Sequence, residues 1–181
     1  MVSVALALVA LVAVAAFGLV LVLARRLRAV TERVDLFLPV SPAGLPLPGT
    51  PVPEFEAVST GGERVTQGAF GEVERVFAML STGCESCLEQ IPAFREFGAS
   101  LTPRPIVVVT GASGHRAPLV AQLRDCAVVI EEPEHGPMAA AFEISDFPTV
   151  LLIRDGVIRQ AEHGLGALLP SLASADSPAR G

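Results

Sequence analysis

The sequence has no tryptophan, no tyrosine and no lysine, and only three of its 181 residues are cysteine. All 13 basic residues are arginine, and 19 acidic residues outnumber them to give a formal charge of −6. Because proteins that hold phosphate backbones usually present a basic surface, this balance argues against nucleic-acid binding. Three cysteines are too few for a small fold held together by disulfides, and they form one close pair with one left over.

Charged residues are also scarce, at 18%, whereas 51% of the residues are hydrophobic. Much of this excess lies between Val2 and Ala24, a run without an ionisable side chain. As a helix the run would reach roughly 34 Å, enough to cross a hydrocarbon core of about 30 Å. A cleaved signal peptide is the alternative, but no basic residue precedes the run and apolar residues continue past the small residues at 13–15. We therefore expect residues 1–24 to be the transmembrane anchor of a single-pass membrane protein.

The rest of the chain divides by composition into four parts. Apolar residues continue past the anchor at alternating steps of four and three, which predicts a juxtamembrane helix over 25–38. Six of the fifteen prolines lie within 39–53, a density that excludes helix and favours an extended linker. An acidic domain is then expected over 54–172, followed by a disordered tail over 173–181.

Hydrophobic periodicity within the domain predicts alternating strands and helices. Four continuous apolar runs are typical of strands covered on both faces, at 76–80, 106–109, 127–130 and 149–153. Helical spacing or an initial proline predicts helices at 88–101, 118–125 and 137–142. Turn residues predict a hairpin over 54–66 and a closing hairpin at Asp155 and Gly156. This order predicts an α/β fold with a mixed central sheet and an N-terminal β-hairpin extension.

Cys84 and Cys87 enclose Glu85 and Ser86 directly after a predicted buried strand, where a helix begins. Unpaired backbone N–H groups and the helix dipole at such a position favour a thiolate. Residues three apart share a helix face at about 5 to 6 Å, a separation that a disulfide can bridge. The spacing therefore predicts an exposed Cys84 that attacks and a more buried Cys87 that resolves the mixed disulfide.

The same pair could instead supply two ligands of a metal site, as in a copper or other metal-binding chaperone. The sequence has no second Cys-x-x-Cys, and His115, His135 and His163 stand apart in predicted loops, so we expect no bound metal. A peroxide-reducing enzyme is a further alternative, which is disfavoured because Thr82 stands two rather than three residues before the thiol. Cys126 is expected to be a packed core residue rather than a third catalytic thiol.

These motifs together resemble the membrane-anchored thioredoxin-like family of TlpA and ResA type, and within it the MauD-like proteins of methylamine-utilisation clusters. The resemblance extends over nearly the whole chain. It rests on the uncharged N-terminus with the segments 23–26 and 31–34 after it, and on the segments 49–55 and 61–66. It also rests on Cys84-x-x-Cys87 with Pro92 five residues later, and on Phe147-Pro148-Thr149 before a strand.

The resemblance implies a thioredoxin-like fold and an enzyme, a thiol–disulfide oxidoreductase that acts on protein disulfides and needs no cofactor. It also implies that Pro148 is cis and lies against the cysteine pair, with Phe147 and Thr149 beside it in contact with the substrate peptide. From the residues alone, Pro148 could simply begin a strand.

Several positions near the cysteines depart from the family pattern. Gly83 stands where many relatives have Trp, Ala78 where thioredoxin has a buried acid, and Gln90 where several relatives have Glu. The charge of Glu85 beside the first cysteine opposes a thiolate. We therefore expect Glu85, Ser86 and Gln90 to tune the redox pair, while the general base and the direction of the reaction stay open.

Two arguments about the membrane side of the domain disagree. Arg25, Arg26, Arg28 and Arg33 follow the anchor with nothing basic before it, which by the positive-inside rule places the domain in the cytoplasm. The resemblance implies an extracytoplasmic domain, where proteins with disulfides occur, and we adopt this expectation. The expected partners are protein thiol or disulfide substrates, a redox partner protein and the lipid bilayer.

Overall fold

The computed structural model of the chain describes residues 44–168. The predicted anchor, juxtamembrane helix and tail lie outside the described residues, and so do the first residues of the predicted linker. Among residues 44–168, no helix is both long and apolar enough to cross a membrane.

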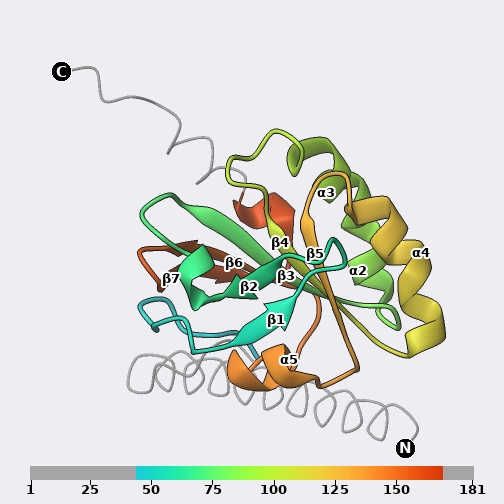
Figure 1. The fold of residues 1–181 in the computed structure, drawn as a ribbon, viewed down its shortest axis with the longest axis horizontal. Helices are drawn as coiled ribbons and strands as arrows, with labels where there is room; N and C mark the ends of the chain where they lie inside the picture. Colours follow the sequence, from blue (N-terminus) through green and yellow to red (C-terminus); the bar gives the residue numbers. More distant parts are fainter. Residues whose placement is uncertain (1–43, 169–181) are drawn as a thin grey trace, which may run out of the picture. The chain divides into compact units, whose positions relative to one another are not determined.

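A five-stranded sheet in the order β5–β4–β3–β6–β7 forms the centre of the domain (Figure 1). β3, β4 and β5 run parallel, whereas β6 pairs antiparallel with β3, and β7 antiparallel with β6. The predicted mixed sheet is thereby confirmed, since each predicted apolar run forms one strand. The strands are β3 (Arg75–Ser81), β4 (Ile106–Thr110), β5 (Val128–Glu132), β6 (Thr149–Arg154) and β7 (Val157–Glu162).

Both faces of this sheet are covered, which explains why its strands read as continuous apolar runs. In β3, Ala78 and Leu80 face a core formed with the helices, whereas Phe77 and Met79 face a second core. The first core lies under α2 (Glu85–Glu89), α3 (Ile91–Phe97) and α4 (Ser113–Leu123). The second lies under β1 (Glu56–Val58), β2 (Arg64–Thr66), η1 (Gln67–Ala69) and α5 (Pro137–Ala141).

The helix predicted over 88–101 is two helices that meet at Gln90. The Gln90 N–H donates to the carbonyl of Cys87 at 3.1 Å, a tightened turn that ends α2. Pro92 has no N–H to give to the carbonyl of Leu88, so one continuous helix would lack a bond at this point. The break separates the short helix that carries the cysteines from α3.

The helix predicted to begin at Pro118 begins five residues earlier, at Ser113, and contains Pro118. Leu119 and Leu123, after the proline, are buried in the first core, and Arg116, before it, donates to the carbonyls of Gly111 and Glu132 at 2.7 and 3.1 Å. Both parts of the helix are thus held in place although proline leaves out one hydrogen bond. His115, which we expected in a loop, therefore lies in the first turns of α4.

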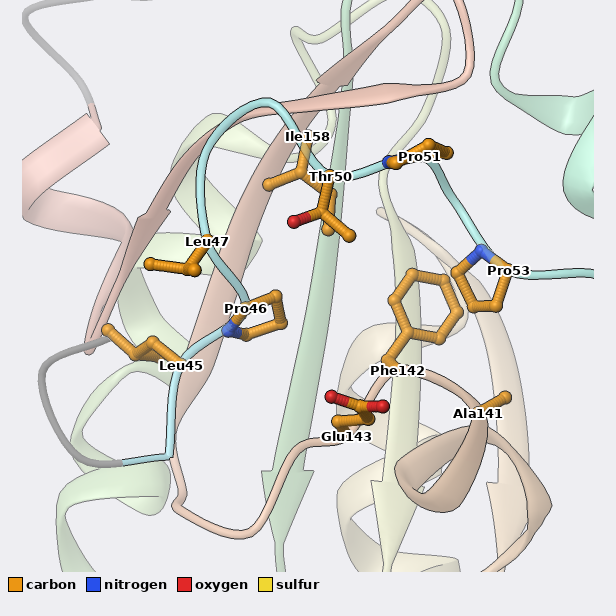
Figure 2. Close-up of a pocket in the computed structure, with 10 residues that line it drawn as sticks. All are labelled: Leu45, Pro46, Leu47, Thr50, Pro51, Pro53, Ala141, Phe142, Glu143 and Ile158. Carbon is orange, nitrogen blue, oxygen red and sulfur yellow. The ribbon is translucent and has the colours of Figure 1, made fainter. Parts of the chain in front are cut away.

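The chain before β1 covers the free edge of β7. Gly49 N–H donates to the Ile158 carbonyl at 2.7 Å, and Ile158 N–H donates to the Thr50 carbonyl at 2.9 Å. Figure 2 shows this stretch of chain beside β7 and Phe142. The part of the predicted linker that the structure describes is therefore hydrogen-bonded to the domain.

The hairpin of β1 and β2 covers the opposite edge of the sheet. Ser59, just after β1, forms an isolated bridge with Ile130 of β5, and Thr60 N–H donates to the Val129 carbonyl at 2.7 Å. Because an uncovered strand edge invites pairing with another chain, covering both edges disfavours aggregation of the sheet.

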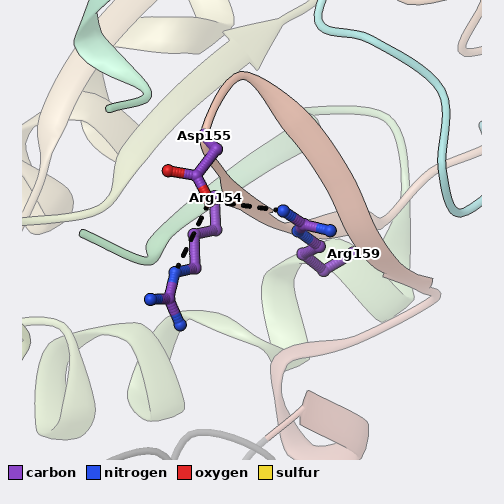
Figure 3. A network of polar contacts seen from close by, with 3 residues as sticks. All are labelled: Arg154, Asp155 and Arg159. Carbon is purple, nitrogen blue, oxygen red and sulfur yellow. Dashed lines mark hydrogen bonds and ion pairs between the residues drawn. The ribbon is translucent and has the colours of Figure 1, made fainter. Parts of the chain in front are cut away.

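The predicted turn at Asp155 and Gly156 joins β6 to β7. Both residues have positive φ, 54° and 66°, the backbone of a two-residue hairpin turn. Asp155 Oδ2 lies 3.3 Å from Arg159 Nη2 and 3.8 Å from Arg154 Nε (Figure 3). These ion pairs are about half exposed and contribute little stability, so the backbone of the turn sets the pairing of β6 with β7.

Candidate functional site

The cysteine pair follows β3 at the edge of the sheet where the parallel strands end. Cys84 is the N-cap of α2, with extended backbone angles of −108° and 114°. A disulfide joins Cys84 to Cys87, with the Cα atoms 5.2 Å apart. Cys84 is partly exposed, whereas Cys87 has no exposed surface. This geometry gives the two sulfurs unequal access to a partner molecule.

Three polar groups donate toward the two sulfurs. The Cys87 N–H donates to Cys84 Sγ at 3.2 Å, and Ser86 Oγ lies 3.2 Å from the same sulfur. A disulfide sulfur carries no proton, so Ser86 is the donor in this state. On the buried side, Ser81 N–H points to Cys87 Sγ at 3.5 Å. Donors directed at a sulfur favour its thiolate once the disulfide is reduced.

Ser81 is a residue of the site that the sequence analysis missed. It stands three residues before Cys84 and carries a hydroxyl, so the spacing argument against a peroxide-reducing enzyme was wrong. Its Oγ accepts a hydrogen bond from Gly83 N–H at 3.3 Å, and the residue is 4% exposed. The hydroxyl thus supports the turn that leads from β3 into the cysteine pair.

The loop before β6 lies against the exposed cysteine. In the pairing of β3 with β6, Thr149 lies opposite Met79, so the loop that ends at Thr149 lies near the end of β3. The Phe147–Pro148 peptide bond is cis, as the resemblance implied. The Phe147 carbonyl oxygen is 3.4 Å from Cys84 Sγ, a distance at which a reduced thiol would donate to it. The structure therefore brings the expected loop and the expected cysteine together.

Thr149 supports this loop from within. Its Oγ1 donates to the Asp146 carbonyl at 2.7 Å, and the residue has no exposed surface. Pro148 is also buried, whereas Phe147 is partly exposed and packs against both cores. Of the three expected substrate-contact residues, Phe147 is the one with exposed surface to offer.

The three expected tuning residues occupy different surroundings. Glu85 and Ser86 are exposed in the first turn of α2, with Ser86 on the sulfur of Cys84. Gln90 is half-buried, and its Oε1 accepts a hydrogen bond from Leu165 N–H at 3.1 Å. The hydrogen bond of Gln90 thus connects the end of α2 to the C-terminal part of the domain.

His163 is a second residue that the sequence analysis missed. Its Nδ1 lies 3.1 Å from the carbonyl oxygen of Pro148. The pairing of Val150 with Glu162 places the residue after β7 opposite the residues before β6. The hairpin was predicted at Asp155 and Gly156, and counting residues back from this turn along both strands would have predicted this neighbour.

Cys126, the third cysteine, is 4% exposed within the first core. Its Sγ donates to the Leu123 carbonyl at 3.2 Å. Burial raises the pKa of the Cys126 thiol, so it stays protonated and a poor nucleophile at neutral pH. These features match the expected core residue.

Within the part of the chain that the structure describes, no acid is buried beneath the cysteine pair, in line with Ala78 at the position where thioredoxin has one. Ala78, at that position in β3, has no exposed surface. The buried carboxylate of Glu132 lies elsewhere, at the end of β5, and accepts from Met138 N–H at 2.9 Å and Ala139 N–H at 3.1 Å. Glu132 therefore caps α5, and its hydrogen bonds assign it no role in proton transfer at the cysteines.

No group of three or more His, Cys, Asp or Glu side chains within residues 44–168 is arranged to hold a metal ion. A pocket of about 350 Å³ lies between the N-terminal stretch and α5 (Figure 2). Apolar and proline side chains line most of it, together with Thr50 and the carboxylate of Glu143, and no cysteine lines it. The pocket therefore is separate from the redox pair.

The domain is similar in structure to several thiol–disulfide oxidoreductases of known structure. No protein-family model and no curated protein sequence matches the chain. The thioredoxin domain of a thiol-disulfide oxidoreductase from Bacteroides vulgatus has a TM-score of 0.61 at 14% identity, over 72% of this chain and 99% of that one.

Two further structures give the same result. A thio-disulfide isomerase from Thermus thermophilus has a TM-score of 0.56 at 20% identity, over 73% of this chain and 99% of that one. A secreted disulfide oxidoreductase of Mycobacterium tuberculosis, described as homologous to DsbE of E. coli, has a TM-score of 0.56 at 14% identity, with coverages of 67% and 96%. The predicted thioredoxin-like fold is confirmed by these neighbours.

Proposed function

We propose that this chain, whose fold is thioredoxin-like, is a thiol–disulfide oxidoreductase that acts on disulfides of other proteins. The observation that carries the proposal is the unequal pair, in which a partly exposed Cys84 caps a helix and a fully buried Cys87 lies within disulfide reach. The fold of the neighbouring oxidoreductases supports it. Leu88, 48% exposed beside Cys87, offers an apolar surface to a protein substrate.

The reaction proceeds in two exchanges when the protein acts as a reductant. The Cys84 thiolate attacks one sulfur of the substrate disulfide, so that a bond from Cys84 to the substrate forms and the substrate disulfide breaks. The released substrate thiolate takes up a proton. Cys87 then attacks Cys84 Sγ, which forms the intramolecular disulfide and releases the second substrate thiol. The substrate gains two electrons that the cysteine pair loses, and oxidation of a dithiol follows the same steps in reverse.

The surrounding residues take defined parts in these steps. The Cys87 N–H and the Ser86 hydroxyl stabilise the Cys84 thiolate by hydrogen bonds to its sulfur. Phe147 presents its backbone next to that sulfur, where an incoming peptide can pair with it. Pro148 shapes the loop behind Phe147, and Thr149 holds this loop in place. The negative charge of Glu85 opposes the Cys84 thiolate. Gln90 holds the end of α2, the helix that carries the cysteines, through its hydrogen bond with Leu165.

Reduction of insulin by the purified full-length chain in detergent micelles, with dithiothreitol as electron source, tests the proposal. We expect wild-type protein to accelerate insulin reduction, the Cys84→Ser variant to have no activity above background, and Cys126→Ala to retain activity as the matched control. Metal analysis of protein purified under reducing conditions tests the metal-chaperone alternative. A stoichiometric bound metal together with no insulin reduction would overturn the oxidoreductase assignment.

We also propose that residues 1–24 anchor the protein in the cell membrane and that the domain faces the extracytoplasmic side. There a separate redox partner protein returns the cysteine pair to its starting oxidation state. The uncharged stretch from Val2 to Ala24 supports the anchor, and the presence of disulfide-bearing substrates outside the cytoplasm supports the side. Protease added to intact spheroplasts should remove the domain. A domain protected until the membrane is dissolved would refute the orientation.

A further inference from the structure

The segment 163–165 lies between the two halves of the candidate site. On one side, His163 Nδ1 is 3.1 Å from the Pro148 carbonyl oxygen. On the other side, Leu165 N–H donates to Gln90 Oε1 at 3.1 Å. We call residues 163–165 the brace, because they connect the loop before β6 to the end of the helix that carries the cysteines.

With the brace, the residues around the cysteine pair form a continuous ring of neighbours. The Gln90 N–H donates to the Cys87 carbonyl at 3.1 Å, the disulfide joins Cys87 to Cys84, and Cys84 Sγ lies 3.4 Å from the Phe147 carbonyl oxygen. His163 completes this ring through its contact with Pro148, the residue after Phe147. In the oxidised protein Cys84 Sγ carries no proton and cannot donate to Phe147, so the hydrogen bonds of His163 and Leu165 are the polar contacts by which the brace holds the two halves of the site.

The position of the brace is fixed by the core beneath it. Leu165 has no exposed surface and belongs to the first core, while Gly164 is buried. A Cβ atom at Gly164 would lie 3.1 to 3.3 Å from the side-chain amide of Gln90, so the glycine permits this close approach. Because Gly164 and Leu165 are buried, the backbone of the exposed His163 is held in place from its C-terminal side.

We propose that His163 is a positioning residue for substrate binding, which holds the Pro148 carbonyl and thereby the Phe147 backbone that receives the substrate peptide. The proposal rests on the oxidoreductase function proposed above. A carbonyl oxygen only accepts hydrogen bonds, so Nδ1 carries the proton, and the other ring nitrogen, Nε2, is free of this contact. Protonation of Nε2 leaves the Nδ1–H donor in place, so the contact persists in both charge states of the ring.

A pair of variants of the full-length chain tests the role, because Asn carries an amide nitrogen at the place of Nδ1. We measure KM and kcat for a cystine-linked peptide and the rate with bis(2-hydroxyethyl) disulfide, which has no peptide backbone. His163→Ala should raise KM for the peptide about three- to tenfold, the loss of one hydrogen bond, without changing kcat or the rate with the small disulfide. His163→Asn should restore KM to within roughly twofold of wild type.

Equal losses on both disulfides, an unchanged KM in His163→Ala, or no recovery in His163→Asn would each overturn the positioning role. If wild-type protein exchanged with neither disulfide, the oxidoreductase proposal itself would fail. In that case, long-range ¹H–¹⁵N spectra of the histidine rings test the contact between His163 and Pro148 by itself. A neutral His163 protonated on Nδ1 supports the contact with Pro148, and a ring protonated on Nε2 overturns it.

Discussion

Cys84 Sγ and the carbonyl oxygen of Phe147 lie 3.4 Å apart although the residues are 63 positions apart in the chain. The antiparallel pairing of β3 with β6 produces this contact, since β6 begins where β3 ends. Under the proposed function, a substrate that reaches Cys84 would also meet the Phe147 backbone of this loop. This relationship is what the proposed function requires of an enzyme that acts on disulfides within peptides.

The hydroxyl of Ser86 should accelerate reactions of Cys84. In the reduced protein, the Ser86→Ala variant loses a donor 3.2 Å from the sulfur, so the thiolate is less stabilised. Alkylation of Cys84 by iodoacetamide at neutral pH should slow about fivefold, the value of one ordinary hydrogen bond. Ser86→Thr keeps the hydroxyl and should retain the wild-type rate. Equal rates in wild type and Ser86→Ala would show that the hydroxyl has no such effect.

The side chain of Gln90 should contribute to stability through Leu165. Gln90→Met keeps the size of the side chain but removes the acceptor of the Leu165 N–H, so the free energy of unfolding should fall by about 1 kcal/mol. Gln90→Glu retains an acceptor oxygen and should lose less. Urea denaturation of the oxidised full-length protein measures both differences. A Gln90→Met variant as stable as wild type would show that the hydrogen bond between Gln90 and Leu165 contributes no stability.

The Thr149 hydroxyl should hold the loop beside the cysteines. Thr149→Val matches the shape of the side chain but leaves the Asp146 carbonyl without the donor that Oγ1 supplies at 2.7 Å. We expect the unfolding free energy to fall by about 1 kcal/mol and insulin reduction to weaken, whereas Thr149→Ser should preserve both. Unaltered stability and activity in Thr149→Val would contradict the supporting role.

Cys126 should make stability depend on alkaline pH. Burial raises the pKa of this thiol above its ordinary value of 9.0, so the unfolded chain loses the proton at a lower pH than the folded chain does. Its contribution is fully present below about pH 9 and is lost as the pH rises through the folded-state pKa. Chemical denaturation of wild type and Cys126→Ala across this range measures the effect. Equal pH slopes for the two proteins would refute it.

The sequence predicts the sheet well because its strands are covered on both faces. The run at 76–80 is apolar throughout for this reason, and it lies within β3, with Phe77 and Met79 in one core and Ala78 and Leu80 in the other. The start of α4 was predicted incorrectly, because Pro118 was read as a helix start although the helix begins at Ser113. Arg116, in the part before the proline, is held by hydrogen bonds to the carbonyls of Gly111 and Glu132, which hydrophobic spacing does not reveal.

Within the candidate site, local spacing predicts the cysteine pair, whereas tertiary contacts decide the rest. Cys84 and Cys87 are three residues apart, so helical geometry alone predicts their disulfide reach. His163 and Gln90 have no local signal, because each finds its partner through strand pairing or through the packing of Leu165. The family resemblance supplied the Phe147–Pro148 loop, which no periodicity in the sequence would have identified.

Trapping of a mixed disulfide tests the central claim most directly. Reduced full-length Cys87→Ser protein, with Cys126 also changed to Ala, is mixed with an oxidised cystine-linked peptide and analysed by intact mass and peptide mapping. We predict a stable adduct of one peptide chain on Cys84, since the resolving thiol is absent. An unmodified Cys84 after exposure to the peptide disulfide would contradict the assignment of this protein as a thiol–disulfide oxidoreductase.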